Sequence, residues 1–151
     1  MGKLEASWTV EIAAPRDLCW EIAADVEGAP AWQATLKSVD VIERDGEKRA
    51  SLVETVSDAK VKEAKAILRF AYDPPGAITW EQESGDVKSL VGSWEFTELA
   101  SGLTEATYAL RADPGRMLGM LLRGPVEGKV KEALTRGAAE GLKSEAESRT
   151  G

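Results

Sequence analysis

Apolar residues recur at helical spacing over one long stretch near the C-terminus, residues 126–147. Val126, Val130, Leu134, Ala138 and Leu142 share one face of this stretch, while Lys, Arg and Glu fill most of the other face. A period of three to four residues over more than twenty positions predicts a single long amphipathic helix. Residues 143–151 carry less of the pattern and are expected to be frayed.

The chain before this helix alternates apolar and polar residues with the two-residue period of a half-buried strand. In residues 4–13, for example, Trp8, Val10 and Ile12 fall on one face and Thr9 and Glu11 on the other. Six later segments show the same alternation: 36–43, 49–56, 60–72, 78–82, 92–96 and 106–110. The short connections between these six segments favour antiparallel pairing of neighbours as a meander.

Two short helical segments are expected between the first strand and the second. Pro15 suits the first position of a helix because its missing N–H would have no partner there. A second helical turn or loop follows Gly28-Ala29-Pro30 and carries Trp32. The predicted order is therefore one strand, two short helices, six strands and a long helix, an α+β fold in a single domain spanning residues 1–151.

The long helix must bury its apolar face on the sheet, because no other helix of similar length is predicted. One helix cannot fill the concave side of a large curved sheet. We therefore expect a gap between helix and sheet, and we expect the function to depend on that gap.

The amino-acid composition removes several kinds of chemistry from consideration. The chain of 151 residues has no histidine and a single cysteine, Cys19. Without the usual general base and metal ligands, we predict no metal site, no cofactor and no assignable catalytic residue. Cys19 shares a predicted helix face with Ile22 and Val26, which favours a packed core position over a nucleophile.

Net charge and hydropathy limit the kinds of partner that this protein is expected to have. The formal net charge is −7, and no basic cluster offsets it, so nucleic-acid binding is not expected. No apolar run reaches the roughly 20 residues of a membrane span, and no N-terminal signal segment is evident. The expected protein is cytoplasmic, does not insert into membranes, and is a monomer or a homodimer.

Several short segments, taken in order, resemble those of one protein superfamily. They are residues 14–20 (Ala-Pro-Arg-Asp-Leu-Cys-Trp), 24–27 (Ala-Asp-Val-Glu), 30–32 (Pro-Ala-Trp), 38–46 (Ser-Val-Asp-Val-Ile-Glu-Arg-Asp-Gly), 92–96 (Gly-Ser-Trp-Glu-Phe) and 113–115 (Asp-Pro-Gly). The set resembles the polyketide cyclase/dehydrase group of the START-like, Bet v 1-like (SRPBCC) helix-grip superfamily.

This resemblance implies a seven-stranded antiparallel sheet that grips the long C-terminal helix around a cavity. Members of the superfamily bind lipids, hormones, polyketides or other apolar molecules, and some catalyse cyclisation or dehydration. The superfamily has no universal catalytic residue, so the resemblance assigns none here.

The predicted ligand-binding residues are those that strand alternation, helix periodicity or the resemblance place at the cavity. They are Trp32, Phe70, Tyr72, Trp80, Trp94, Tyr108, Leu121, Val130 and Leu134. Ordinary core packing is the competing interpretation for each aromatic residue. By the same parity Glu54, Gln82 and Tyr108 could point inward, and for each of them a rim or surface position is the competing interpretation.

Three functions of different classes follow. The first is binding or transport of a small hydrophobic ligand, such as a lipid, an isoprenoid or an aromatic polyketide-like molecule. The second is a polyketide aromatase/cyclase or dehydratase that uses the same cavity. The third is a protein-binding adaptor that presents the apolar residues 117–122.

Overall fold

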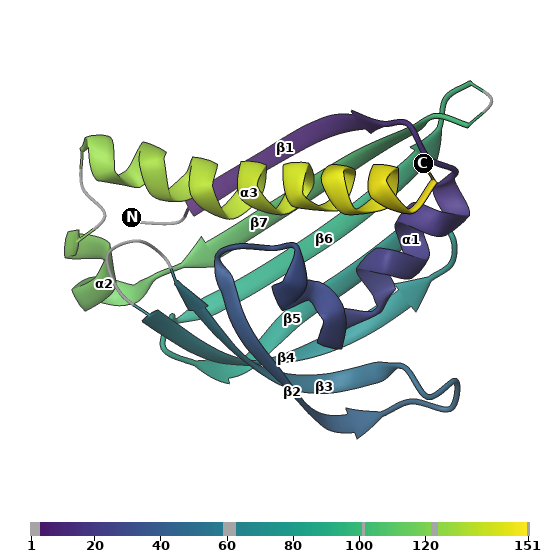
Figure 1. Ribbon diagram of the computed structural model, residues 1–151. Helices are drawn as coiled ribbons and strands as arrows, with labels where there is room; N and C mark the ends of the chain where they lie inside the picture. Colours follow the sequence, from purple (N-terminus) through teal and green to yellow (C-terminus); the bar gives the residue numbers. More distant parts are fainter. Residues whose placement is uncertain (1–3, 59–62, 101, 122–123, 151) are drawn as a thin grey trace.

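The computed structural model describes residues 4–58, 63–100, 102–121 and 124–150. A seven-stranded antiparallel sheet curves around the long helix α3, with the shorter helices at its ends (Figure 1). The strands are β1 (Leu4–Ile12), β2 (Leu36–Arg44), β3 (Ala50–Asp58), β4 (Glu63–Asp73), β5 (Ala77–Gly85), β6 (Ser89–Glu98) and β7 (Thr104–Asp113). The helices are α1 (Arg16–Ala24), the 3-10 helix η1 (Val26–Ala31), α2 (Gly115–Leu121) and α3 (Pro125–Thr150). The predicted α+β helix-grip fold is confirmed.

The strand order is β1-β7-β6-β5-β4-β3-β2, with every pair antiparallel. Strands β2 to β7 form the predicted meander. Strand β1 instead pairs with the last strand, from Leu4 opposite Ala112 to Ile12 opposite Thr104. This is possible because α1 and η1 carry the chain from one edge of the sheet to the other (Figure 1).

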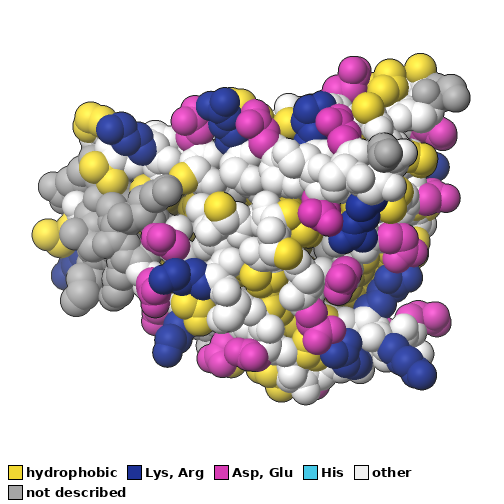
Figure 2. All heavy atoms as spheres, viewed as in Figure 1, with side chains coloured by type: hydrophobic (Ala, Val, Ile, Leu, Met, Phe, Trp, Pro, Cys, Tyr) yellow, Lys and Arg dark blue, Asp and Glu magenta, His cyan; other side chains and the backbone are white. Residues whose placement is uncertain are grey.

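Helix α3 packs across the concave face of the sheet, mainly against β1 and β7. Its buried side chains are mostly small: Val130, Thr135, Ala138, Ala139, Leu142 and Ala146. Figure 2 shows basic and acidic side chains gathered along the outer surface of the same helix. The i,i+4 ion pairs of this helix include Lys131–Glu127 and Arg136–Glu140. None of the helices in the described ranges is long and apolar enough to cross a membrane.

The end of α3 is helical and is hydrogen-bonded to the end of β1 and the residue that follows it. The expectation of fraying over 143–151 is therefore wrong for residues 143–150. The Lys143 ammonium donates to the Glu11 carbonyl at 2.7 Å, and the Glu147 carboxylate accepts the Ala13 N–H at 2.9 Å. The backbone hydrogen bond from Ala13, together with Lys143, lowers the pKa of Glu147. Both contacts tie the last turns of α3 to the end of β1, and Gly151 lies outside the described residues.

One end of the interior is filled with side chains. Trp20, Ile22 and Leu142 are buried there between α1, α3 and the sheet, and the Trp20 indole donates to the Ala77 carbonyl at 3.0 Å. Cys19 is fully buried in the same cluster, and burial raises the pKa of its thiol. Its predicted position in the core is confirmed.

Helix α3 can pack closely against the loop after η1 because Gly141 has no side chain. A Cβ placed on Gly141 would lie 2.0 Å from the Trp32 carbonyl oxygen, at the end of η1. Gly137, one turn earlier, has nothing within 4 Å of the same position. Only one of the two glycines is therefore required by a close approach.

Of the residues 117–122 considered for a protein-binding patch, the side chains of Met117, Leu118, Leu121 and Leu122 lie outside the described residues. Met120 is exposed. The protein-binding alternative therefore stays a prediction.

Substitution of Gly141 and Gly137 by alanine should have different effects on stability. Gly141→Ala should lower the free energy of unfolding by about 1 to 3 kcal/mol, because the added methyl group forces α3 away from Trp32. Gly137→Ala, the matched control, should leave stability unchanged or raise it by up to about 1 kcal/mol through helix propensity. Denaturant unfolding measures both values. A Gly141→Ala variant as stable as the parent chain would contradict the close approach.

Candidate functional site

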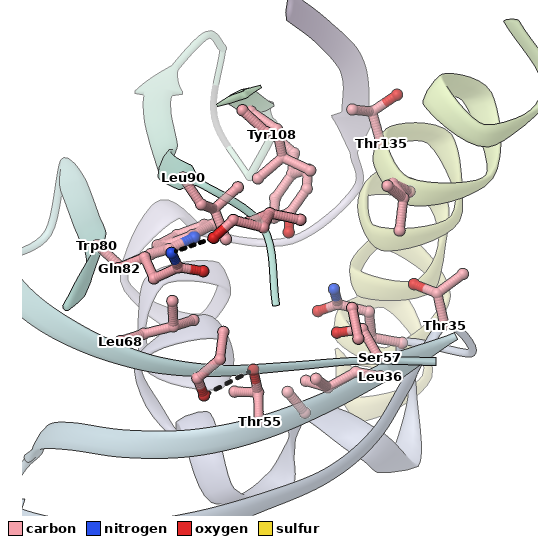
Figure 3. Close-up of a pocket in the computed structure, with 18 of the residues that line it drawn as sticks. Thr35, Leu36, Thr55, Ser57, Leu68, Trp80, Gln82, Leu90, Tyr108 and Thr135 are labelled. Carbon is pink, nitrogen blue, oxygen red and sulfur yellow. Dashed lines mark hydrogen bonds between the residues drawn. The ribbon is translucent and has the colours of Figure 1, made fainter. Parts of the chain in front are cut away.

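A cavity of about 190 Å³ lies between the concave face of the sheet and the N-terminal half of α3. Its wall comes from all seven strands, from the segment at η1 and from α3 (Figure 3). From α3 the contributing residues are Val130, Lys131, Leu134 and Thr135, whereas the later part of the helix covers the filled end. The interior is therefore packed at one end and hollow at the other.

Aromatic rings form the floor of the cavity on the sheet side. In the strand register Phe70 lies opposite Trp80, and Trp94 lies opposite Tyr108. The ring centroids of Phe70 and Trp80 are 5.4 Å apart, those of Trp80 and Tyr108 5.5 Å, and those of Trp94 and Tyr108 4.7 Å. Trp32, from the loop after η1, approaches Trp94 with a centroid distance of 6.2 Å. Such contacts stabilise the rings beyond their buried area.

The Trp80 indole packs directly over Gly92 on β6. The two residues are directly paired across β5 and β6, and a Cβ on Gly92 would lie 2.3 Å from the indole ring. The absence of a side chain lets Trp80 lie against the β6 backbone. A larger residue at position 92 would displace the indole.

Seven of the nine predicted ligand-binding residues line the cavity: Trp32, Phe70, Trp80, Trp94, Tyr108, Val130 and Leu134. The prediction of a cavity position is wrong for Tyr72, which packs edge-on against Trp20 and donates its hydroxyl to the Ala50 carbonyl at 2.6 Å. Tyr72 shares a face with Phe70 but lies two residues further along β4, at the filled end. The side chain of Leu121 lies outside the described residues.

Several polar residues at the cavity were not in the predicted set. Gln33, Thr35, Thr55, Ser57 and Thr135 contribute to its wall. Strand parity could have suggested Thr55 and Ser57, but small hydroxyl residues carry no strong signal of their own.

Among the three residues assigned inward positions by parity, Gln82 and Tyr108 do line the cavity, so their rim or surface alternative is wrong. Glu54 is exposed, in agreement with its surface alternative.

The charged groups at the cavity are basic. No Asp or Glu of the described residues lines it, and its charged lining residues are Lys65 and Lys131, the latter paired with Glu127 at 3.0 Å. Burial raises the pKa of Tyr108 to about 12, and a hydrogen bond with Gln33 only partly offsets this. Tyr108 is therefore a neutral phenol at physiological pH, able to donate or accept a hydrogen bond.

The part of the chain that the structure describes contains no group of three or more His, Cys, Asp or Glu side chains suited to a metal ion.

Residues 12–138 match the protein family described as polyketide cyclase / dehydrase and lipid transport. The chain belongs to this family. The resemblance found in the sequence is thereby confirmed. No curated protein matches the chain.

Several solved structures share the fold of this chain. A protein from Thermus thermophilus is 20% identical with a TM-score of 0.85, covering 98% of this chain and 100% of its own. Zhui aromatase/cyclase from Streptomyces sp. R1128 is 22% identical with a TM-score of 0.84, covering 99% and 96%. A START superfamily protein from Mycobacterium smegmatis is 20% identical with a TM-score of 0.83, covering 96% and 98%. At these identities the likeness concerns the fold.

The two tyrosines should ionise only under strongly alkaline conditions. Burial is the main cause that raises the pKa of both Tyr72 and Tyr108 from 10.0 to about 12. At about pH 11 the native protein should show little tyrosinate absorbance, while the chain in denaturant should titrate with a midpoint near pH 10.

Stability should change over the same range. Between pH 10 and 12 the two tyrosines of the unfolded chain release protons that the native state keeps. The free energy of unfolding should therefore fall as the pH rises through this range and level off above about pH 12. Tyr108→Phe should remove about half of the late absorbance change. A native titration centred at pH 10 would contradict the burial of both phenols.

Proposed function

We propose that this protein binds a small apolar molecule, such as a lipid, an isoprenoid or an aromatic polyketide-like compound, in the cavity beneath α3. The observation that carries the proposal is a hollow of about 190 Å³ with a floor of closely packed Trp80, Trp94 and Tyr108 rings and no carboxylate among the described lining residues. An apolar cavity of about 150 Å³ in an engineered protein stays dry and accepts benzene. The space here is of a size that admits at least an aromatic ring.

The energetics of an apolar void favour occupation. The residues around it lose packing contacts on one side, and a void of this size costs on the order of a few kcal/mol. A ligand of matching shape would restore those contacts without moving charged groups. Selection for packing alone would instead have favoured larger side chains at lining positions such as Ala64 and Ala66.

Catalysis in the same cavity is the second candidate. It is favoured by the match to the polyketide cyclase / dehydrase family, by the similarity in fold to Zhui aromatase/cyclase and by the Tyr108 phenol at the cavity wall. A phenol with a pKa of about 12 can donate a proton or hold a carbonyl oxygen, but at neutral pH it is a poor general base. No histidine exists in the chain, and no carboxylate among the described lining residues supplies that role. We therefore rank binding above catalysis.

Turnover of an aromatic polyketide-like substrate would reverse this ranking. In that case Tyr108→Phe should reduce turnover strongly while leaving binding in place, because it removes the hydroxyl and keeps the ring. Steady-state rates and binding constants of the two proteins provide the comparison. Equal rates would exclude Tyr108 from the chemistry.

Filling the cavity should abolish binding. Leu134→Trp places a larger side chain into the hollow from α3, whereas Lys129→Trp adds the same side chain at an exposed position of the same helix. A panel of fatty acids, isoprenoid alcohols and polycyclic aromatics should raise the unfolding temperature of the parent chain and of Lys129→Trp. A ligand present at a hundredfold excess over its Kd should add about 2.7 kcal/mol to the free energy of unfolding.

The folded Leu134→Trp variant should show no such increase. Quenching of tryptophan fluorescence offers a second readout, because Trp32, Trp80 and Trp94 all line the space. Absence of any shift across the panel, or equal shifts in both variants, would refute binding in this cavity.

A further inference from the structure

The two charged residues at the cavity wall are lysines that differ in the direction of their side chains. Lys65 lies on β4 between Ala64 and Ala66, which also line the cavity. Because successive side chains of a strand point to opposite faces, the Lys65 ammonium is directed to the outer face of the sheet, and this residue is exposed. Among the described lining residues, Lys131 is therefore the cation on the cavity side.

Lys131 lies on the inward-facing side of α3. Val130, the residue before it, is buried at the cavity wall, and so is Thr135, one helical turn later (Figure 3). Residues four positions apart share one face of a helix, so the Lys131 side chain starts from the same face as Thr135. A lysine can lay its methylene groups along an apolar wall while its ammonium stays hydrated. The Lys131 side chain is 32% exposed, which fits a charge at the rim of the cavity.

The ion pair with Glu127 does not account for this position of Lys131. The ammonium and the Glu127 carboxylate are 3.0 Å apart and belong to residues four positions apart on α3. Arg136 and Glu140 form the same kind of pair with both residues exposed and outside the cavity wall. Such pairs contribute little to stability, so a ligand can compete with Glu127. An ammonium also has three donors, which lets Lys131 bind a second oxygen anion.

This combination favours a ligand with an apolar body and one negative charge at its end. The aromatic floor accepts the apolar body, and no Asp or Glu of the described lining residues would repel an anion. One ammonium balances one charge, while the net charge of −7 opposes a dianion such as a phosphate monoester. A carboxylate carries a single charge and forms charge-assisted hydrogen bonds with an ammonium.

We propose that Lys131 is a specificity-determining residue that binds the carboxylate of an amphiphilic ligand at the rim of the cavity. This inference rests on the proposed binding function and deepens it by naming the ligand class. It ranks fatty acids and other acids with an apolar body above the corresponding amides, alcohols and hydrocarbons. In the protein without ligand, Glu127 occupies the ammonium.

Two probes of nearly equal shape test the proposal: decanoic acid, which is ionised at neutral pH, and decanamide, which is neutral. The quantity to compare is the ratio of their two dissociation constants, measured by calorimetry. Lys131→Met removes the ammonium and keeps most of the apolar side chain. Lys129→Met, the matched control, removes the same charge from an exposed position of α3 outside the cavity wall. Comparing ratios between proteins cancels the different hydration of the two probes.

The preference for decanoate over decanamide should fall about fivefold in Lys131→Met, because the carboxylate loses its charged partner. In Lys129→Met it should change by less than about twofold, because salt screens an exposed charge that does not touch the ligand. Lys131→Arg keeps the positive charge and should retain most of the preference.

Removal of the competing carboxylate should act in the opposite direction. Glu127→Gln frees the Lys131 ammonium and should raise the preference for decanoate about threefold. Glu132→Gln is the matched control, because it removes the same charge from an exposed residue that pairs with Arg136 instead, and it should change the preference by less than about twofold. A purely structural role of Lys131 would produce no such gain.

An unchanged preference in Lys131→Met, an equal fall in Lys129→Met, or no gain in Glu127→Gln would overturn the role of Lys131 while leaving binding in the cavity intact. If the parent chain bound neither probe but bound polycyclic aromatics or isoprenoid alcohols, the carboxylate class would be wrong and the cavity would keep its function. If no member of the ligand panel bound, the binding function itself would fail, and this inference with it.

Discussion

The packing of a single helix on a wide, curved sheet is the constraint on which the rest of this structure depends. Helix α3 contacts mainly β1 and β7, at one edge of the sheet, and reaches the loop after η1 only because Gly141 leaves space for the Trp32 carbonyl. Side chains of α1 and η1 fill one end of the remaining interior. At the other end, under the N-terminal half of α3, the described side chains leave the cavity. The cavity is thus a geometric result of how few helices cover so many strands.

The chemistry of that cavity is a balance between an aromatic floor and a small number of neutral polar groups. The closely packed rings of Trp80, Trp94 and Tyr108 offer a large apolar surface, while the Tyr108 hydroxyl supplies a polar group that can orient a ligand. None of these groups carries charge at neutral pH, given the raised pKa of Tyr108. A site of this kind discriminates by shape and by hydrogen bonding. It is poorly equipped to abstract protons.

Much of this arrangement could be read from the sequence, because two-residue and three-to-four-residue periods report which face of an element is buried. Periodicity does not report how far along a strand the cavity extends, and for that reason Tyr72 was placed in it together with Phe70. Periodicity also does not show which segments far apart in the sequence are in contact. The hydrogen bonds of Lys143 and Glu147 to the end of β1 keep the last turns of α3 helical, although local composition suggested fraying.

The position of β1 has a consequence for how the molecule is made. Its partner in the sheet is β7, so Leu4 meets Ala112 only after nearly three quarters of the chain has left the ribosome. Until then the edge of β1 and the aromatic face of the meander have no cover, and such long-range pairing is associated with slow folding and exposure to aggregation. Closure by α3 must come later still, because that helix follows β7 in the chain. We expect the nascent chain to remain open until its C-terminal segment emerges, a stage at which chaperones that shield apolar strands would have most effect.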